Sequence, residues 1–303
     1  MTAALRHQVV TGDGVAIAAR EWPKADAETV LLLHGYPDDQ TVWDDVAKLL
    51  NHDYRVVSYD VRGSGASDAP LQMQDYSHQK LADDFAAVIR ALAPSQKIHL
   101  VAHDWGSVQA WFFVNQPELV ASIKSYCSIS GPGLDYIGQV LRRRIKRPTP
   151  INLWLLVKQL LMSWYVFAFH LPFLGPYPRR MGLAGRWFKL VSRLEKLPPN
   201  PSEHRRKNSI NGMQLYRANI FKSLFKPQPF QVNIPVLLIV PTQDRFLSPS
   251  SYDDLGDFVP QLTRKDIRCG HWLPLLEPAL LADEVRQFIN SGSHPERLAR
   301  PTV

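Results

Sequence analysis

Asp104 is the residue whose type and surroundings in the sequence point most directly to chemistry. It lies in Ala-His-Asp-Trp-Gly (residues 102–106), between the apolar run 98–101 and a helical pattern over residues 108–113. A turn from strand to helix flanked by small residues holds its central side chain in a strained position, where serine is the commoner residue. A carboxylate instead attacks saturated carbon, and the resulting alkyl ester can be hydrolysed again. The sequence therefore predicts an aspartate nucleophile.

Asp244 and His271 could supply the other groups that such an ester requires. Hydrolysis needs a base that activates water and a carboxylate that orients the base. Asp244 follows the apolar run 236–240, and His271 lies in a glycine turn after the run 263–268. Either residue alone is typical of an ordinary turn, but nucleophile, acid and histidine follow three predicted strands in the order that such sites use. We therefore predict a triad of these two residues with Asp104.

Backbone N–H groups are expected beside Asp104 to hold the oxygen that becomes negatively charged during ester hydrolysis. The N–H groups of Tyr36 and Trp105 are the natural pair, since one follows the turn His34-Gly35 and the other directly follows the nucleophile. Removing one such donor typically costs about 2.7–4 kcal/mol of transition-state stabilisation. His34 is expected to brace its loop and not to transfer protons.

The strands and helices that must position these residues can be recognised from hydrophobic patterning. Short apolar runs predict strands at residues 8–10, 15–20, 29–33, 55–59, 98–102, 123–129, 236–240 and 263–268. Helical periodicity alternates with them at residues 42–50, 79–92, 108–113, 252–258 and 278–289. This alternation predicts an α/β fold with a mostly parallel, doubly wound sheet, which binds ligands beyond the carboxyl ends of its strands. The glycine-rich segment 60–68 lacks the lysine and spacing of a phosphate loop and is interpreted as a structural connection.

Charge divides the 303-residue chain into two units. Residues 131–232 contain 18 Lys and Arg against 3 Asp and Glu, whereas the remainder contains 17 against 25. We therefore predict an α/β core at residues 1–130 and 233–290, with an inserted helical cap at residues 131–232. Within the cap we expect a pocket-lining helix from the apolar run 153–174, proline-rich turns at 172–178, and helices at 186–194 and 204–225. Residues 291–303 are expected to form a loose tail.

Cysteine content and charge bear on location and partners. Cys127 and Cys269 cannot form a disulfide framework, and residues 1–20 show no signal-peptide pattern, so a cytoplasmic protein is expected. The net charge of +7 does not favour nucleic acid binding, because the basic run 142–147 lacks interleaved stacking aromatics and the remaining body is acidic. Beside the apolar run 153–174, these cations could bring the cap into peripheral contact with an anionic membrane. Polar residues interrupt that run, which argues against a spanning helix.

Four segments together resemble a known family. His-Gly-Tyr-Pro at residues 34–37, His-Asp-Trp-Gly at 103–106, Asp244, and Cys-Gly-His-Trp at 269–272 are similar to α/β-hydrolases of the aspartate-nucleophile branch. This branch contains epoxide hydrolases and haloalkane dehalogenases, and the resemblance extends to about residue 290. It is closest to the hydrolase module that precedes a short-chain dehydrogenase in some bacterial proteins. The resemblance implies the α/β-hydrolase fold with an inserted helical cap.

The leaving group distinguishes the two activities of this branch. Epoxide hydrolases resemble one another in two cap tyrosines that assist the departing oxygen. Tyr165 and Tyr216 lie in segments similar to theirs, which implies the same role here, although either residue taken alone could be an ordinary core aromatic. Dehalogenases typically have a halide-binding asparagine where this chain has Tyr36. The resemblance therefore favours an epoxide over a halide.

These predictions combine into one function, the hydrolysis of an apolar epoxide to a vicinal diol. Asp104 is expected to attack the epoxide carbon while Tyr165 and Tyr216 stabilise the departing oxygen. His271, oriented by Asp244, is then expected to activate the water that cleaves the ester. No metal or organic cofactor is expected, and the oligomeric state is left open. Two alternatives also stay open: haloalkane dehalogenation, and a non-catalytic binding module on a hydrolase scaffold.

Overall fold

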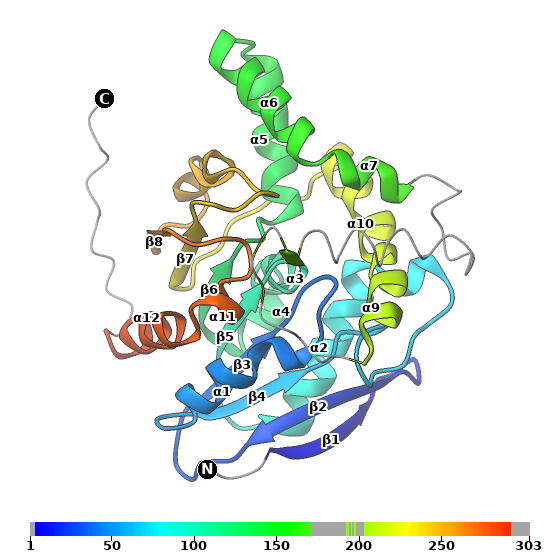
Figure 1. Cartoon of the computed structure of the whole chain (residues 1–303), viewed down its shortest axis with the longest axis vertical. Helices are drawn as coiled ribbons and strands as arrows, with labels where there is room; N and C mark the ends of the chain where they lie inside the picture. The colour runs from blue at the N-terminus through cyan, green and yellow to red at the C-terminus, as the bar shows by residue number, and fades with distance from the viewer. Residues whose placement is uncertain (1–3, 171–191, 194, 196, 198–202, 292–303) are drawn as a thin grey trace.

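An eight-stranded sheet forms the centre of the molecule in the computed structural model, which describes residues 4–170, 192, 193, 195, 197 and 203–291 (Figure 1). The strand order is β1-β2-β4-β3-β5-β6-β7-β8. The strands are β1 (Leu5–Val10), β2 (Ala16–Trp22), β3 (Thr29–Leu33), β4 (Arg55–Tyr59), β5 (Ile98–His103), β6 (Ile123–Ile129), β7 (Val236–Pro241) and β8 (Leu262–Ile267). β2 pairs antiparallel with β1 and β4, and all other pairs are parallel. The predicted α/β fold with a mostly parallel sheet is confirmed.

The apolar runs of the sequence are the buried strands of this sheet. Every residue of β3, β5 and β7 is buried, as expected where helices cover both faces of a parallel sheet. Because the strands run side by side in one direction, the segments after β3, β5, β7 and β8 emerge at the same edge. The predicted triad and the two predicted oxyanion donors follow these strands.

Helices cover both faces of the sheet, which confirms the doubly wound arrangement. On one face, α1 (Asp44–Leu50), α11 (Leu273–Leu276) and α12 (Pro278–Asn290) share a core cluster with Trp43. On the other face, α2 (His78–Leu92) packs on α3 (Trp105–Val114), and the rings of Phe85 and Phe113 stack with centroids 4.7 Å apart. Shorter elements are η1 (Gln40–Trp43), η2 (Met73–Tyr76) and α4 (Pro117–Val120).

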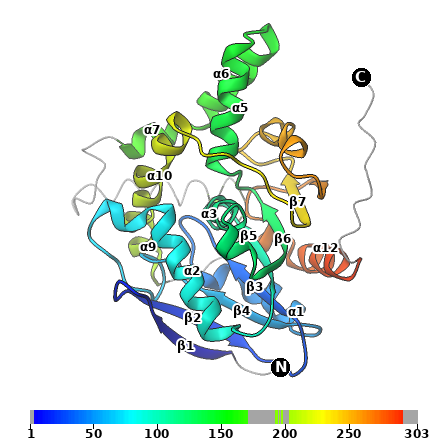
Figure 2. The same ribbon diagram turned by 180° about the vertical axis from the view of Figure 1, so that it is seen from behind.

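Helices make up the described part of the insert between β6 and β7. They are α5 (Leu134–Lys146), α6 (Pro150–Met162), α7 (Trp164–His170), α9 (Arg205–Asn211) and α10 (Met213–Phe225). α6 begins where Thr149 caps the Asn152 N–H and Pro150 occupies the first turn, both of which favour a helix start. α5 and α6 project away from the sheet as an arm, which both views show (Figures 1 and 2).

Two helix predictions are corrected by the structure. The segment 204–225 is not one helix but α9 and α10, divided at Gly212, where an added Cβ would lie 2.4 Å from the Tyr36 ring. The segment 252–258 is not an α-helix but parts of two 3₁₀ turns, η5 (Pro249–Tyr252) and η6 (Leu255–Asp257). Its buried residues Tyr252, Leu255 and Phe258 recur every three positions, which matches the 3₁₀ period of three residues per turn.

Other sequence predictions fall on parts of the chain that are not described. The turns at 172–178, most of the helix at 186–194 and all but the first residue of the tail at 291–303 lie outside the described residues. The pocket-lining helix predicted at 153–174 is observed in its described part as α6 and α7, with Ser163 between them.

The glycine-rich segment 60–68 joins the core to the helical insert. Asn208 in α9 accepts a hydrogen bond from the Gly65 N–H at 2.9 Å and donates to Asp39 Oδ2 at 3.0 Å. The Lys207 ammonium donates to the Gly65 carbonyl at 2.9 Å, and Asn211 donates to the Gly63 carbonyl at 3.0 Å. These hydrogen bonds agree with the interpretation of this segment as a structural connection.

Candidate active site

Asp104 stands at a strained turn where β5 meets α3. Its backbone has φ 52° and ψ −123°, a conformation that costs a non-glycine residue energy and persists only when the surrounding structure enforces it. Close packing provides that enforcement, because a Cβ at Gly106 would lie 2.3 Å from the Leu33 carbonyl oxygen. The small residue two positions after the aspartate is therefore a steric requirement of the turn.

The structure brings Asp244 and His271 to Asp104. His271 Nδ1 lies 2.7 Å from Asp244 Oδ2, and His271 Nε2 lies 3.5 Å from Asp104 Oδ2. Asp244 is held in turn by the N–H groups of Phe246 and Leu247, which donate to its Oδ1 at 2.7 and 3.1 Å. All three side chains of the triad are at most 15% exposed. The arrangement allows a base, its orienting carboxylate and a nucleophile to act on one bound molecule.

The charges of the triad stabilise one another. Burial opposes the charged form of His271, but the attraction of Asp244 and the contact with Asp104 outweigh burial and raise the pKa of His271 to about 10. Burial alone would raise the pKa of Asp244, yet His271 and the two backbone donors hold that pKa below its usual range. At neutral pH the resting site therefore holds a protonated His271 imidazole beside the Asp244 carboxylate.

Asp104 Oδ1 occupies the site predicted for the oxyanion. The Tyr36 N–H donates to it at 2.6 Å. The Trp105 nitrogen lies close to the same place, since a Cβ at Gly35 would be 2.3 Å from Asp104 Oδ1 and 2.6 Å from Trp105 N. Both predicted donors are thus beside one carboxylate oxygen, and Gly35 leaves them room.

Two neighbouring histidines are hydrogen-bonded to the backbone around the site. His34 Nε2 accepts the Val61 N–H at 3.0 Å and its Nδ1–H donates to the Gly35 carbonyl at 2.9 Å, so it braces its loop as predicted. His103 Nε2 contacts the His271 carbonyl oxygen at 2.9 Å. Burial, together with the nearby His271, lowers the pKa of His103 to about 4. His103 is therefore neutral and donates this hydrogen bond, which fixes the turn of His271.

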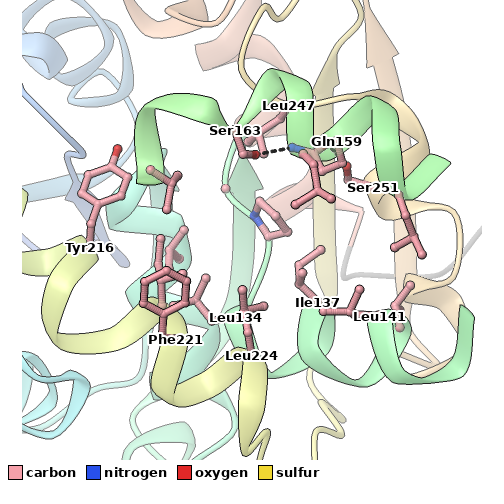
Figure 3. A pocket seen from close by; sticks show the side chains of 18 of the residues that line it. Leu134, Ile137, Leu141, Gln159, Ser163, Tyr216, Phe221, Leu224, Leu247 and Ser251 are labelled. Atoms are coloured by element: carbon pink, nitrogen blue, oxygen red, sulfur yellow. Dashed lines mark hydrogen bonds between the residues drawn. The ribbon is translucent and has the colours of Figure 1, made fainter. Parts of the chain in front are cut away.

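Tyr165 and Tyr216 line a cavity of about 370 Å³ that also contains Asp104. The two rings lie 6.0 Å apart between centroids in an edge-to-face arrangement. Figure 3 shows Tyr216 beside apolar side chains of α5 and α10, and the hydrogen bond of 2.8 Å between Gln159 and Ser163 on the opposite wall. Apolar residues dominate the lining, among them Leu134, Ile137, Leu141, Phe221, Leu224 and Leu247.

Both tyrosines are neutral hydrogen-bond donors at ordinary pH. Burial raises the pKa of Tyr165 far above its usual value, and the negative charge of Asp104 adds to the effect. Burial likewise raises the pKa of Tyr216, with contributions from Tyr165 and Asp104. The lining of the cavity therefore includes two protonated phenols together with the Asp104 side chain.

Glu195 is a site residue that the sequence predictions missed. Its side chain is 3% exposed and faces Arg245 Nε at 3.1 Å, and its Oε2 accepts the His271 backbone N–H at 3.1 Å. An added Cβ at Gly270 would lie 2.3 Å from the same oxygen. The carboxylate thus holds the turn of His271 and, through Arg245, the loop of Asp244. Composition was the signal that could have pointed to Glu195, because it is one of only 3 acidic residues in the basic segment 131–232.

Comparison with known proteins assigns the family. Residues 28–278 match the profile of the α/β hydrolase fold family. The chain belongs to this family. This α/β-hydrolase is 33% identical over 305 residues to a Mycobacterium tuberculosis protein named probable oxidoreductase EphD, an alignment that covers 98% of the chain and 52% of the relative. The chain therefore spans about half the length of that relative.

Other similar proteins carry the name epoxide hydrolase. Epoxide hydrolase 1 of Caenorhabditis elegans is 28% identical over 283 residues, which cover 88% of the α/β-hydrolase chain and 65% of the relative. A crystal structure of a mutant epoxide hydrolase from Bacillus megaterium with its diol product superposes with a TM-score of 0.76, covering 94% of this chain and 100% of that one. At 22% identity, that structural likeness supports the fold alone.

Proposed function

We propose that the chain is an epoxide hydrolase that converts an apolar epoxide to a vicinal diol. The observation that carries the proposal is one apolar cavity that contains Asp104, Tyr165 and Tyr216. Protonated phenols opposite a carboxylate suit a substrate whose leaving group is an oxygen atom, because that oxygen gains negative charge as its bond to carbon breaks. The names of the C. elegans and other relatives support the same activity.

Asp104 forms an ester in the first step of the proposed mechanism. Its Oδ2 bonds to an epoxide carbon and the bond from that carbon to the ring oxygen breaks. The ring oxygen takes a proton from Tyr165 or Tyr216, which contributes about 10²–10⁴-fold to the rate. Oδ1 stays on the Tyr36 N–H and becomes the carbonyl oxygen of the ester. The apolar cavity walls exclude water that would otherwise solvate the nucleophile.

Water cleaves the ester in the second step. The phenolate left by the first step takes the proton of the His271 imidazolium. The neutral His271 Nε2 then takes a proton from water, and the hydroxide adds to Cγ of Asp104 while negative charge develops on Oδ1 beside the two backbone donors. The Cγ–Oδ2 bond then breaks, and the departing oxygen takes the proton of the hydroxyl that was added to Cγ. The diol leaves, Asp104 is again a carboxylate, and His271 keeps the proton that it took from water. Ester formation neutralises Asp104, whose charge helps to raise the pKa of His271. The pKa of His271 therefore falls after the first step, so that the imidazolium can give up its proton before it acts as the base.

Tyr36 supports an oxygen leaving group over a halide. Its hydroxyl donates to the Ser209 carbonyl at 3.1 Å, and its ring packs edge-to-face on Tyr216 with centroids 5.3 Å apart. A dehalogenase would need a side-chain N–H at this position to hold the departing halide. Here the side chain ties the loop to the helical insert instead.

We further propose the predicted division into a core, residues 1–130 and 233–290, and a cap, residues 131–232. All strands in the described part of the chain lie outside the cap, and cap helices α7 and α10 carry the two tyrosines. A cytoplasmic location and peripheral membrane contact through the cap remain part of the proposal. Free, buried thiols at Cys127 and Cys269 are compatible with a reducing compartment.

Trapping the ester tests the proposal. A His271→Ala variant incubated with epoxides should gain the mass of one substrate molecule on the peptide that contains Asp104, because ester formation needs no base. An Asp104→Ala variant is the matched control and should gain none. Labelling by haloalkanes, with chloride or bromide release by the wild type, would identify a dehalogenase. Failure of both panels to label would support a binding module.

The tyrosines have their own test. Replacing both Tyr165 and Tyr216 by phenylalanine should lower the rate of ester formation by about 10²–10⁴-fold, while hydrolysis of preformed ester changes less. Unchanged epoxide turnover in the double variant would contradict the assignment.

A further inference from the structure

Apolar side chains cover the outward surface of α6 and α7. Eight of them are between 48% and 68% exposed: Ile151, Leu153, Trp154, Val157, Leu160, Leu161, Trp164 and Phe167. A helix that is apolar all round is normally buried in a core or a membrane, and soluble monomers rarely expose apolar patches of this extent. The described core does not cover this face, since α6 packs on α5 and α7 and the arm projects away from the sheet (Figure 2).

The charges around this face are positive. Lys146, Arg147 and Lys158 are exposed, and residues 136–170 contain no acidic side chain. The structure also revises the predicted role of the basic run 142–147, because half of it braces α5. Arg143 and Arg144 pair with Asp257 and Asp254, and Arg142 donates to the Phe225 carbonyl oxygen. The outward cations are therefore those at the tip of α5 and on α6.

We propose that the outward face of α6 and α7 docks on an anionic lipid bilayer, with Lys146, Arg147 and Lys158 at the headgroups. Apolar side chains bordered by cations match the interfacial zone of such a surface. A second copy of the chain fits less well, since a symmetric contact would bring the same cations together without acidic partners on this face.

The helices fit a position in the interface and not across the bilayer. Among the described residues, no single helix is long and apolar enough to span a membrane. α6 and α7 pass that test only as a pair, and a bend of 53° separates them. The bent pair instead presents Trp154 and Trp164 with the other exposed apolar residues, and tryptophan is enriched at the level of the headgroups.

The docking face adjoins the mouth of the catalytic cavity. Ile145 in α5 and Leu160 in α6 both line the cavity and are 59% and 55% exposed. The inner side of α6 contributes Leu155 and Leu156 to the same lining, which reaches Asp104 at its other end. An apolar epoxide dissolved in the bilayer thus enters between α5 and α6 without crossing water. This entry route rests on the proposed epoxide hydrolase activity, whereas docking itself does not.

Vesicle binding tests the docking surface. Vesicles of equal parts phosphatidylcholine and phosphatidylglycerol are compared with pure phosphatidylcholine by co-sedimentation. Val157→Asp/Leu161→Asp changes two exposed residues that are absent from the cavity lining. Leu71→Asp is the matched control, since Leu71 is 94% exposed outside the cap. The wild type and Leu71→Asp should bind the anionic vesicles, and the cap variant should bind about tenfold or more weakly.

Measurements of epoxide hydrolysis distinguish the docking proposal from the proposed epoxide hydrolase activity. A short water-soluble epoxide should be hydrolysed equally by all three proteins, whereas a long-chain epoxide partitioned into the vesicles should be hydrolysed more slowly by the cap variant alone. The docking proposal would be overturned if the wild type did not bind the anionic vesicles. It would also be overturned if Leu71→Asp lost as much vesicle binding as the cap variant. The wild type could instead form a dimer that Val157→Asp/Leu161→Asp dissociates, and not bind vesicles. This result would assign the face to self-association and would also overturn the docking proposal. Vesicle binding without turnover of any epoxide would retain docking and refute the proposed activity.

Discussion

Gly35→Ala is the most direct test of how the nucleophile is positioned. The added Cβ would lie 2.3 Å from Asp104 Oδ1 and 2.6 Å from Trp105 N, where ordinary contacts begin at 3.4 Å. The carboxylate or its turn must therefore move by about 1 Å, which breaks the 2.6 Å hydrogen bond from the Tyr36 N–H. A displacement of that size costs roughly 10²-fold in rate, and we expect that loss in kcat. Overpacking should also destabilise the fold by about 1–3 kcal/mol.

The assay must separate lost positioning from lost folding. Diol formation and the burst of ester are measured well below the unfolding midpoint, and urea unfolding gives the stability of each protein. Gly256→Ala is the matched control, because its added Cβ meets nothing within 4 Å, and its rate should stay within about twofold of the wild type. A folded Gly35→Ala protein that also stayed within about twofold would refute the reasoning.

Four further variants test the groups around His271. Asp244→Asn places an amide N–H against His271 Nδ1 and puts the remaining ring proton on Nε2, so ester hydrolysis should slow by roughly 10³–10⁴-fold while one equivalent of ester still forms in a burst. Glu195→Ala should cost about 1–3 kcal/mol of stability by leaving the His271 N–H without an acceptor, and Glu195→Gln should restore most of it; equal losses would contradict that hydrogen bond. The pKa of His271 is raised from 6.5 to about 10 on folding, so its contribution to stability is complete below pH 6.5 and declines toward pH 10. Urea unfolding should therefore show a smaller decline over this range in His271→Gln than in the wild type.

Local patterns in the sequence predicted the strand ends well. The run before Asp104, the run before Asp244 and the turn at His271 each contain their own signal, because apolar periodicity and small turn residues act over a few positions. In parallel strands that share one sheet, the carboxyl ends meet at one edge. Three residues that are distant in the sequence could thus be assigned to one site before any distance was known.

Non-local packing explains the helix predictions that were wrong and the site residue that was missed. Over so short a segment, the spacing of Tyr252, Leu255 and Phe258 is compatible with the period of an α-helix and with that of a 3₁₀ helix. The segment forms 3₁₀ turns, in which these three side chains are buried. The helix division at Gly212 depends on the Tyr36 ring, which comes from the loop after β3. Glu195 carries no motif, and its role exists only because the chain brings it beneath the turn of His271.

The sequence by itself determined the chemical groups and the order of the elements that carry them. It contains the carboxylate, base and phenols, and it marks the strand ends where the first two lie, because those signals are local. Tertiary structure alone decided which oxygen of Asp104 meets the Tyr36 N–H, which cations of the run 142–147 stay outward, and which face of α6 the described residues leave exposed. These features depend on contacts between segments far apart in the chain, and no short stretch of sequence contains both partners of such a contact.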